Sequence, residues 1–120
     1  MEGQIQSLER RLAEVTSRFF ESKIGVKPQE VQVLEQGDLI VLRVRGFLAK
    51  AEAAIVQRPE DRQILTNYYT RLFESFYPMV EVVVEQACKR SIIDRQAILD
   101  LPNSECVYLL TLGGSAPERG

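Results

Sequence analysis

The 120-residue chain contains no histidine and no tryptophan, and cysteine occurs only twice, at Cys88 and Cys106. Without imidazole, it lacks the side chain most often used for acid–base catalysis and for binding transition metals. The cysteines do not form a C-x-x-C pair, so we interpret them as reduced, buried thiols; a disulfide between them is the less favoured alternative. A thiol in apolar surroundings is a poor nucleophile. We therefore expect a protein that is not an enzyme and that has no cofactor and no metal.

Long apolar runs and excess basic charge are also missing. No apolar run approaches the roughly 18 residues needed to span a bilayer, and the first 25 residues are charged throughout, unlike a signal peptide. The formal net charge of -2 provides no general attraction to phosphate backbones. We expect a cytoplasmic protein that neither inserts into a membrane nor binds nucleic acid.

The composition is that of a globular domain. Hydrophobic residues make up 45% of the chain and charged residues 27%, and 120 residues are enough to bury one core. The last eight residues, from Gly113 to Gly120, are rich in glycine and contain a proline. We expect one α+β domain over residues 1–112 and a flexible tail over residues 113–120.

The first part of the chain has the pattern of a helix followed by a β-hairpin. Apolar residues at helical spacing predict a helix over about Gln4–Ser22, closed by Gly25 and Pro28; its stripe is Ile5, Leu8, Leu12, Val15 and Phe19. A strand around Val31 and Val33, a turn at 35–38 and a strand over Leu39–Leu48 follow. The stripe is interpreted mainly as core, although its coiled-coil spacing also fits a docking helix.

The second part repeats this order. After a short helical connection over Lys50–Gln57, a long helix begins at Pro59 and extends to about Arg90, with Pro78 predicting a kink or a junction between two helices. Strands within Ser91–Leu101 and Cys106–Leu112 form the second hairpin, joined by a turn at 102–105. The predicted fold is αββαββ, with a four-stranded, mainly antiparallel sheet, two long helices and a kink in the second.

The hairpins carry more apolar residues than one copy of this fold can bury. Leu39 and Val41 share one face of their strand with Arg43 and Arg45, and the last strand is apolar on both faces. Two helices can cover only one face of a four-stranded sheet, so a symmetric partner is the simplest cover for the other. We therefore expect a homodimer; the candidate interface residues are Leu39, Val41, Val107, Leu109 and Phe19.

Other clusters admit two interpretations each. Arg43 and Arg45 could bind a small anion, although ion pairs at the sheet rim are the favoured alternative. Glu81 and Glu85 could share a divalent cation, but a solvated helix face is more common. The aromatic residues of the second long helix could line a pocket for an apolar ligand, with core packing as the default; they are Tyr68, Tyr69, Phe73, Phe76 and Tyr77.

A family resemblance adds to this reading. It is carried by Gly25-x-x-Pro28-x-x-Val31, Gly46-Phe47-Leu48, Ala49-x-x-Glu52, Arg62 and Pro78. With these elements the chain, from about Leu12 to Gly113, resembles a bacterial family named for the C component (MpsC) of a Na⁺-translocating, membrane-potential-generating system. Ala49 stands where threonine is usual, and 87–90 lacks a glycine that relatives tend to carry.

The resemblance implies a cytosolic accessory protein connected with membrane machinery for ion or inorganic-carbon uptake, and so a membrane-protein partner. It supplies no catalytic residues. Together with the sequence patterns, it favours a small non-catalytic accessory or regulatory protein that acts through self-association and protein partners. The alternative is a module that binds a small anion or an apolar molecule, with Arg43, Arg45 and the tyrosines as its lining.

Overall fold

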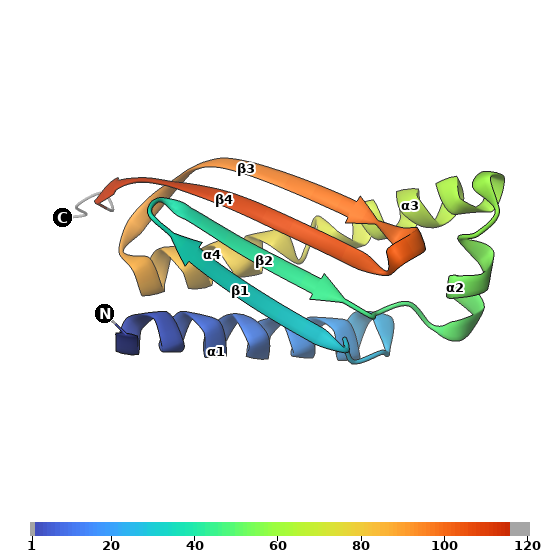
Figure 1. Ribbon diagram of the computed structural model, residues 1–120, viewed down its shortest axis with the longest axis horizontal. Helices are drawn as coiled ribbons and strands as arrows, with labels where there is room; N and C mark the ends of the chain where they lie inside the picture. Colours follow the sequence, from blue (N-terminus) through green and yellow to red (C-terminus); the bar gives the residue numbers. More distant parts are fainter. Residues whose placement is uncertain (1, 116–120) are drawn as a thin grey trace.

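The computed structural model describes the chain from Glu2 to Ser115, with side chains from Leu8 to Gly114 (Figure 1). Ile5 of the predicted stripe and residues 116–120 of the predicted tail therefore lie outside the described side chains. The helices are α1 (Glu2–Phe19), α2 (Lys50–Ile55), α3 (Pro59–Phe73) and α4 (Tyr77–Cys88), with a π-helical turn at Phe20–Ile24 and a 3₁₀ turn at Leu101–Asn103. The strands are β1 (Glu30–Gln36), β2 (Leu39–Arg45), β3 (Arg90–Asp100) and β4 (Glu105–Ser115).

The four strands form one sheet in the order β1-β2-β4-β3, and every neighbouring pair is antiparallel. Figure 1 shows α4 behind this sheet, α1 along its β1 side in contact with α4, and α2 and α3 extending past its end. The molecule is accordingly long, with extents of 49 × 23 × 23 Å. The predicted α+β fold with a four-stranded antiparallel sheet is confirmed.

The core lies between the helices and the inner face of the sheet. Alternate residues of β2 (Ile40, Leu42 and Val44) point inward and are buried, as are Leu8 and Leu12 of α1. Next to them, where α1, α3 and α4 meet the end of β2, six aromatic rings pack with centroid distances of 4.8–6.3 Å; they are Phe19, Phe20, Phe47, Tyr69, Phe73 and Phe76.

Phe19 was predicted as an interface residue, and the structure places it in the core instead. Its side chain is only 3% exposed and its ring contacts Phe20, Phe73 and Phe76. The helical stripe of α1 is therefore used inside the domain, which leaves little apolar surface for a docking helix. The turn after Phe19 ends at Gly25, whose φ of 82° is the left-handed conformation that the sequence predicted at this helix end.

The interruption predicted at Pro78 is found as a junction between two helices. The chain leaves α3 at Phe73 and enters α4 at Tyr77, and tight turns in between are closed by Phe76 N–H donating to Phe73 O at 2.9 Å. Pro78 lies in the first turn of α4, where a missing N–H breaks no helical hydrogen bond. The helical run ends at Cys88, slightly before the predicted Arg90.

The last strand is longer than the sequence suggested. β4 continues to Ser115, which lies opposite Arg90 of β3, and the guanidinium of Arg90 donates to the carbonyl of Gly113 at 2.7 Å. Residues 113–115 are therefore part of the sheet and not of a tail beginning at Gly113. Glycine and serine do not forbid a strand, and pairing with β3 fixes this segment.

Candidate functional site

The face of the sheet turned away from the helices carries an apolar patch. Leu34, Val41 and Leu109 lie opposite one another across β1, β2 and β4, and Val107 lies beside Ile98 in the next row. Leu39 extends the patch toward the β1–β2 turn. The patch is thus contributed by all four strands: Leu34, Leu39, Val41, Ile98, Val107 and Leu109.

These side chains are open to solvent in the single chain. Leu34 is 54% exposed, Leu39 40% and Ile98 46%, while Val41, Val107 and Leu109 are partly exposed between them. No helix of the described part of the chain lies on this face (Figure 1). Four of the five predicted interface residues are therefore brought together here, and Phe19 is the exception.

Both arginines that were candidates for anion binding are held by carboxylates of neighbouring strands. The Nε of Arg43 lies 2.9 Å from Oε2 of Glu105, and Nη1 of Arg45 lies 3.3 Å from Oε1 of Glu30. The hydrogen bond to Glu105 raises the pKa of Arg43. Both arginines are thus in ion pairs; Arg45 lies at the end of its strand, whereas Arg43 lies within the sheet between Gln32 and Val107.

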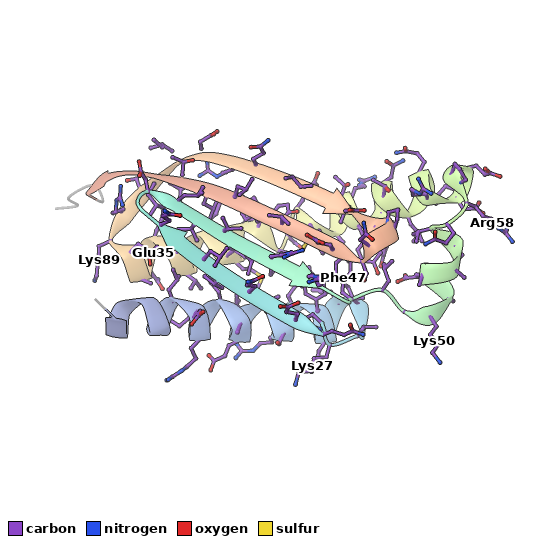
Figure 2. The ribbon with its side chains drawn as sticks, viewed as in Figure 1. Lys27, Glu35, Phe47, Lys50, Arg58 and Lys89 are labelled. Atoms are coloured by element: carbon purple, nitrogen blue, oxygen red, sulfur yellow. The ribbon has the colours of Figure 1, made fainter. Side chains whose placement is uncertain are left out.

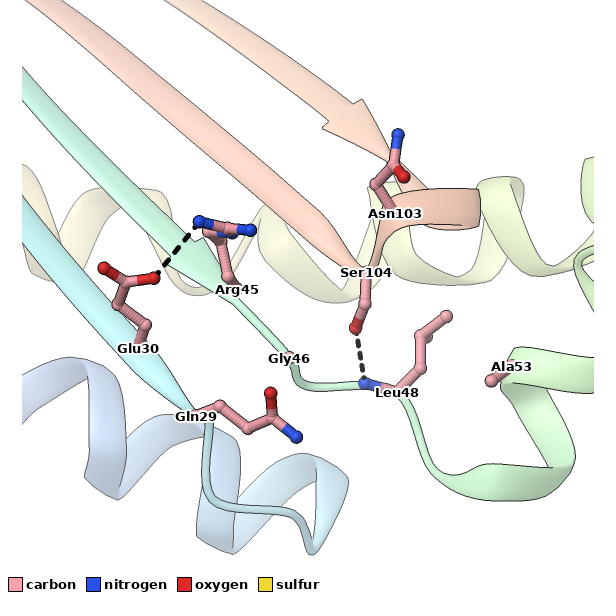
Figure 3. A pocket seen from close by; sticks show the side chains of 8 residues that line it. All are labelled: Gln29, Glu30, Arg45, Gly46, Leu48, Ala53, Asn103 and Ser104. Carbon is pink, nitrogen blue, oxygen red and sulfur yellow. Dashed lines mark hydrogen bonds and ion pairs between the residues drawn. The ribbon is translucent and has the colours of Figure 1, made fainter.

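Arg45 differs from Arg43 in one respect, because it also lines a groove at the end of the sheet (Figure 3). The groove has a volume of about 530 Å³ and lies between the start of β1, the segment after β2 and the β3–β4 turn. Its lining is Gln29, Glu30, Arg45, Gly46, Leu48, Ala53, Asn103 and Ser104. Of these residues, only Arg45 was predicted to bind a ligand, although Gly46 and Leu48 belong to the motif that carries the family resemblance.

Hydrogen bonds make the floor of this groove rigid. The hydroxyl of Ser104 accepts the backbone N–H groups of Phe47 at 2.8 Å and Leu48 at 2.9 Å, and its carbonyl accepts Gly46 N–H at 2.8 Å. Gly46 has a φ of 73°, and the side chain of Gln29 lies so close that a Cβ at position 46 would approach it to 2.6 Å. Glycine is therefore required here on both grounds.

Glu81 belongs to a network between α4 and the sheet. Its carboxylate accepts the hydroxyl of Tyr108 and pairs with the Nε of Arg95 at 2.9 Å. The neighbouring Glu85 accepts the backbone N–H of Ile92 at 3.1 Å. Burial and the bond to Glu81 raise the pKa of Tyr108. The two carboxylates thus join helix to sheet; Glu85 is exposed, as predicted, whereas the side chain of Glu81 is only 21% exposed.

Most of the remaining aromatic and thiol groups are buried or partly buried, and Tyr68, at 51% exposed, is the exception. Tyr69 donates its hydroxyl to Oε1 of Glu52 at 2.7 Å, and Tyr77 stacks on Tyr108 with a centroid distance of 4.0 Å. Both cysteines are free, as expected. Burial raises the pKa of Cys106 to about 12 and also raises the pKa of Cys88, so both thiols stay protonated at neutral pH.

Lysine and arginine side chains are spread around the molecule. Figure 2 shows Lys27, Lys50, Arg58 and Lys89 pointing outward at different places on the surface. Within residues 2–115, no group of three or more cysteine, aspartate or glutamate side chains is placed to hold a metal ion. Across the same residues, each helix is too short or too polar to cross a bilayer.

These features define a small α+β protein whose sheet is covered by helices on one side and bare on the other. A family model with the description "Na+-translocating membrane potential-generating system (MpsC)" matches residues 4–113. Since the match spans most of the chain, the protein belongs to the MpsC family. No curated protein and no solved structure gives a significant match.

Proposed function

We propose that this chain is a cytoplasmic, non-catalytic accessory protein that works as a homodimer, with the apolar patch as the surface on which a second copy packs. Through its family, it is connected with a Na⁺-translocating system, and a membrane protein of that system is the proposed partner of the dimer. The observation that carries the proposal is the patch itself, six apolar residues that no helix of the described chain covers.

The size of the face supports a second copy as its cover. The sheet lies along part of a side that measures 49 by 23 Å as a whole, and a second copy placed there could bury an area on the order of the 800 Å² per partner typical of stable interfaces. Two sheets of this kind pack face to face about 10 Å apart, with apolar side chains interleaved between them. A two-fold axis would place each patch against its own copy.

The charges around the patch are compatible with such packing. Arg43 and Arg45 are each neutralised within the chain by Glu105 and Glu30, so two copies can approach without an uncompensated cluster of one sign at this end of the sheet. The patch itself contains no charged side chain. Arg43 lies next to the patch, opposite Val107 and two residues from Val41, so the proposed interface would include its ion pair with Glu105.

The non-catalytic part of the proposal rests on the state of the candidate groups. Both thiols have raised pKa values, and a thiolate is the form that attacks. The carboxylate of Glu81 is already occupied by Tyr108 and Arg95. These groups are used to hold the fold together, so they support a protein that acts through its surface.

Sedimentation velocity over a dilution series from 200 µM to 0.2 µM tests the proposal directly. We expect a reversible shift from dimer to monomer, because six partly exposed apolar residues on each copy would be buried. A chain that stays monomeric at 200 µM contradicts the dimer. Purification from a native membrane extract, with bound proteins identified, tests the partner separately; failure to retain any membrane protein contradicts that part alone.

A further inference from the structure

The groove at the end of the sheet holds the features of a ligand site, and we propose that it binds a free α-amino acid with an aliphatic side chain. The proposal does not depend on dimerisation. Three kinds of group meet in this groove: a guanidinium beside a carboxylate, a hydroxyl that can act only as a donor, and an apolar wall (Figure 3).

The charged pair at one side of the groove suits a ligand that carries both charges. Arg45 and Glu30 lie 3.3 Å apart, and their side chains are 47% and 49% exposed. Exposed pairs of this kind contribute little to stability, so a ligand can replace them. An amino acid does so without leaving a charge unpaired, because its carboxylate binds Arg45 while its ammonium group binds Glu30.

The same pair disfavours a simple anion. Phosphate or bicarbonate would gain the attraction of Arg45 but would meet the carboxylate of Glu30, which is held next to it. A phosphate group also carries more negative charge than one guanidinium neutralises. The groove is therefore matched to a zwitterion better than to the anion that the sequence suggested for Arg43 and Arg45 together.

Ser104 gives the groove a directed donor. Its hydroxyl oxygen already accepts the N–H groups of Phe47 and Leu48, which occupies both lone pairs. The hydroxyl hydrogen remains as the group that can reach a ligand, and it favours an acceptor such as a carboxylate oxygen. Because the two backbone N–H groups fix Ser104, this donor is held in place before any ligand arrives.

The opposite side of the groove is apolar. Leu48, just after β2, and Ala53 of α2 form this wall, and Figure 3 shows both on the side away from the Arg45–Glu30 pair. The volume of about 530 Å³ lies within the range of small-molecule sites. An aliphatic side chain on the ligand would lie against the wall while its charged groups meet the pair.

Titration of the full-length ¹⁵N-labelled protein with L-leucine, followed by amide NMR shifts, tests the site. We expect saturable shifts concentrated at Gly46, Leu48 and Ser104. Two analogues each lack one charge: 4-methylpentanoate has no ammonium group and 3-methylbutylamine has no carboxylate. Each should bind at least about tenfold more weakly than leucine, and inorganic phosphate should produce no localised shift.

Two pairs of variants separate the groove from its surroundings. Arg45→Gln should weaken leucine binding at least about tenfold, whereas Arg43→Gln, which removes the other rim arginine outside the groove, should leave it within about twofold. Ala53→Leu fills the groove and should abolish the shifts. Ala54→Leu is its control, because Ala54 is exposed on the same helix but does not line the groove.

The amide spectrum of each variant also reports whether it is folded, so lost binding can be told from lost structure. Absence of saturation with leucine overturns the proposal. Equal binding of leucine and 4-methylpentanoate also overturns it, since Glu30 would then have no part in recognition. Phosphate binding as tight as that of leucine would mark a plain anion site and would likewise contradict it.

Discussion

Replacing Leu109 by lysine should separate the proposed dimer into folded monomers. Leu109 lies in a central strand of the sheet, between Val41 and Gln96, and its side chain is partly exposed on the open face. In a single chain the lysine stem can lie along the sheet with its ammonium group in water, so the cost to folding should be below about 1 kcal/mol.

In the dimer the same substitution occurs twice, because both copies contribute this position. Each copy loses the burial of the exposed part of one leucine, about 1 kcal/mol. Each copy also brings an ammonium group into a partly desolvated interface, which adds at least about 1 kcal/mol. Over the two copies, the total loss is about 4 kcal/mol or more, which corresponds to a Kd raised at least about 700-fold.

Sedimentation equilibrium of wild type and Leu109→Lys measures this change, and circular dichroism confirms that the variant is folded. Gln57→Lys is the control for added charge, since Gln57 is polar and exposed in the turn after α2, outside the sheet. Its Kd should stay within about threefold of wild type. If Leu109→Lys dimerises as tightly as wild type, the patch is not the interface and the reasoning fails.

Three further predictions concern stability. Phe20→Ala should lower the free energy of unfolding, measured in urea, by about 3–5 kcal/mol, because the ring is 0% exposed and contacts four other rings. Tyr68→Ala is the control: its position is 51% exposed, so the substitution should cost under about 1 kcal/mol. Glu81→Ala should cost about 2–3 kcal/mol by thermal denaturation, since it removes the acceptor of Tyr108 and the partner of Arg95; a change below 0.5 kcal/mol would rule out this role. Stability should fall as the pH rises above about 9, because burial raises the pKa of Cys106 from 9.0 to about 12 and the unfolded thiol loses its proton first. Cys106→Ala should reduce that slope between pH 9 and pH 11, and an unchanged slope would assign the effect to other groups.

The sequence predicted the elements of the fold well because their patterns are local. The stripe of α1, the Gly37 turn between β1 and β2, and the proline at the start of α3 all act within a few residues of themselves. The apolar patch was also found from alternation, which shows which residues of a strand share a face. Alternation did not show how far the side chains on each face would be buried.

The misses share a different cause, since they depend on contacts between distant segments. Phe19 is buried because α3 and α4 bring Phe73 and Phe76 to it, which no spacing in α1 reveals. The groove joins Gln29, Arg45 and Ser104 from three parts of the chain. In the sequence Ser104 has the pattern of an ordinary turn residue, and its role as an acceptor for the chain after β2 becomes visible only in three dimensions.

The central pairing of β2 with β4 has a consequence for how the protein is made. The β1–β2 hairpin can form early, but the sheet closes only when β4 pairs with β2, a strand made much earlier. Until β4 has been synthesised, the inner edge of the first hairpin lacks its partner and is open to pairing with other nascent chains.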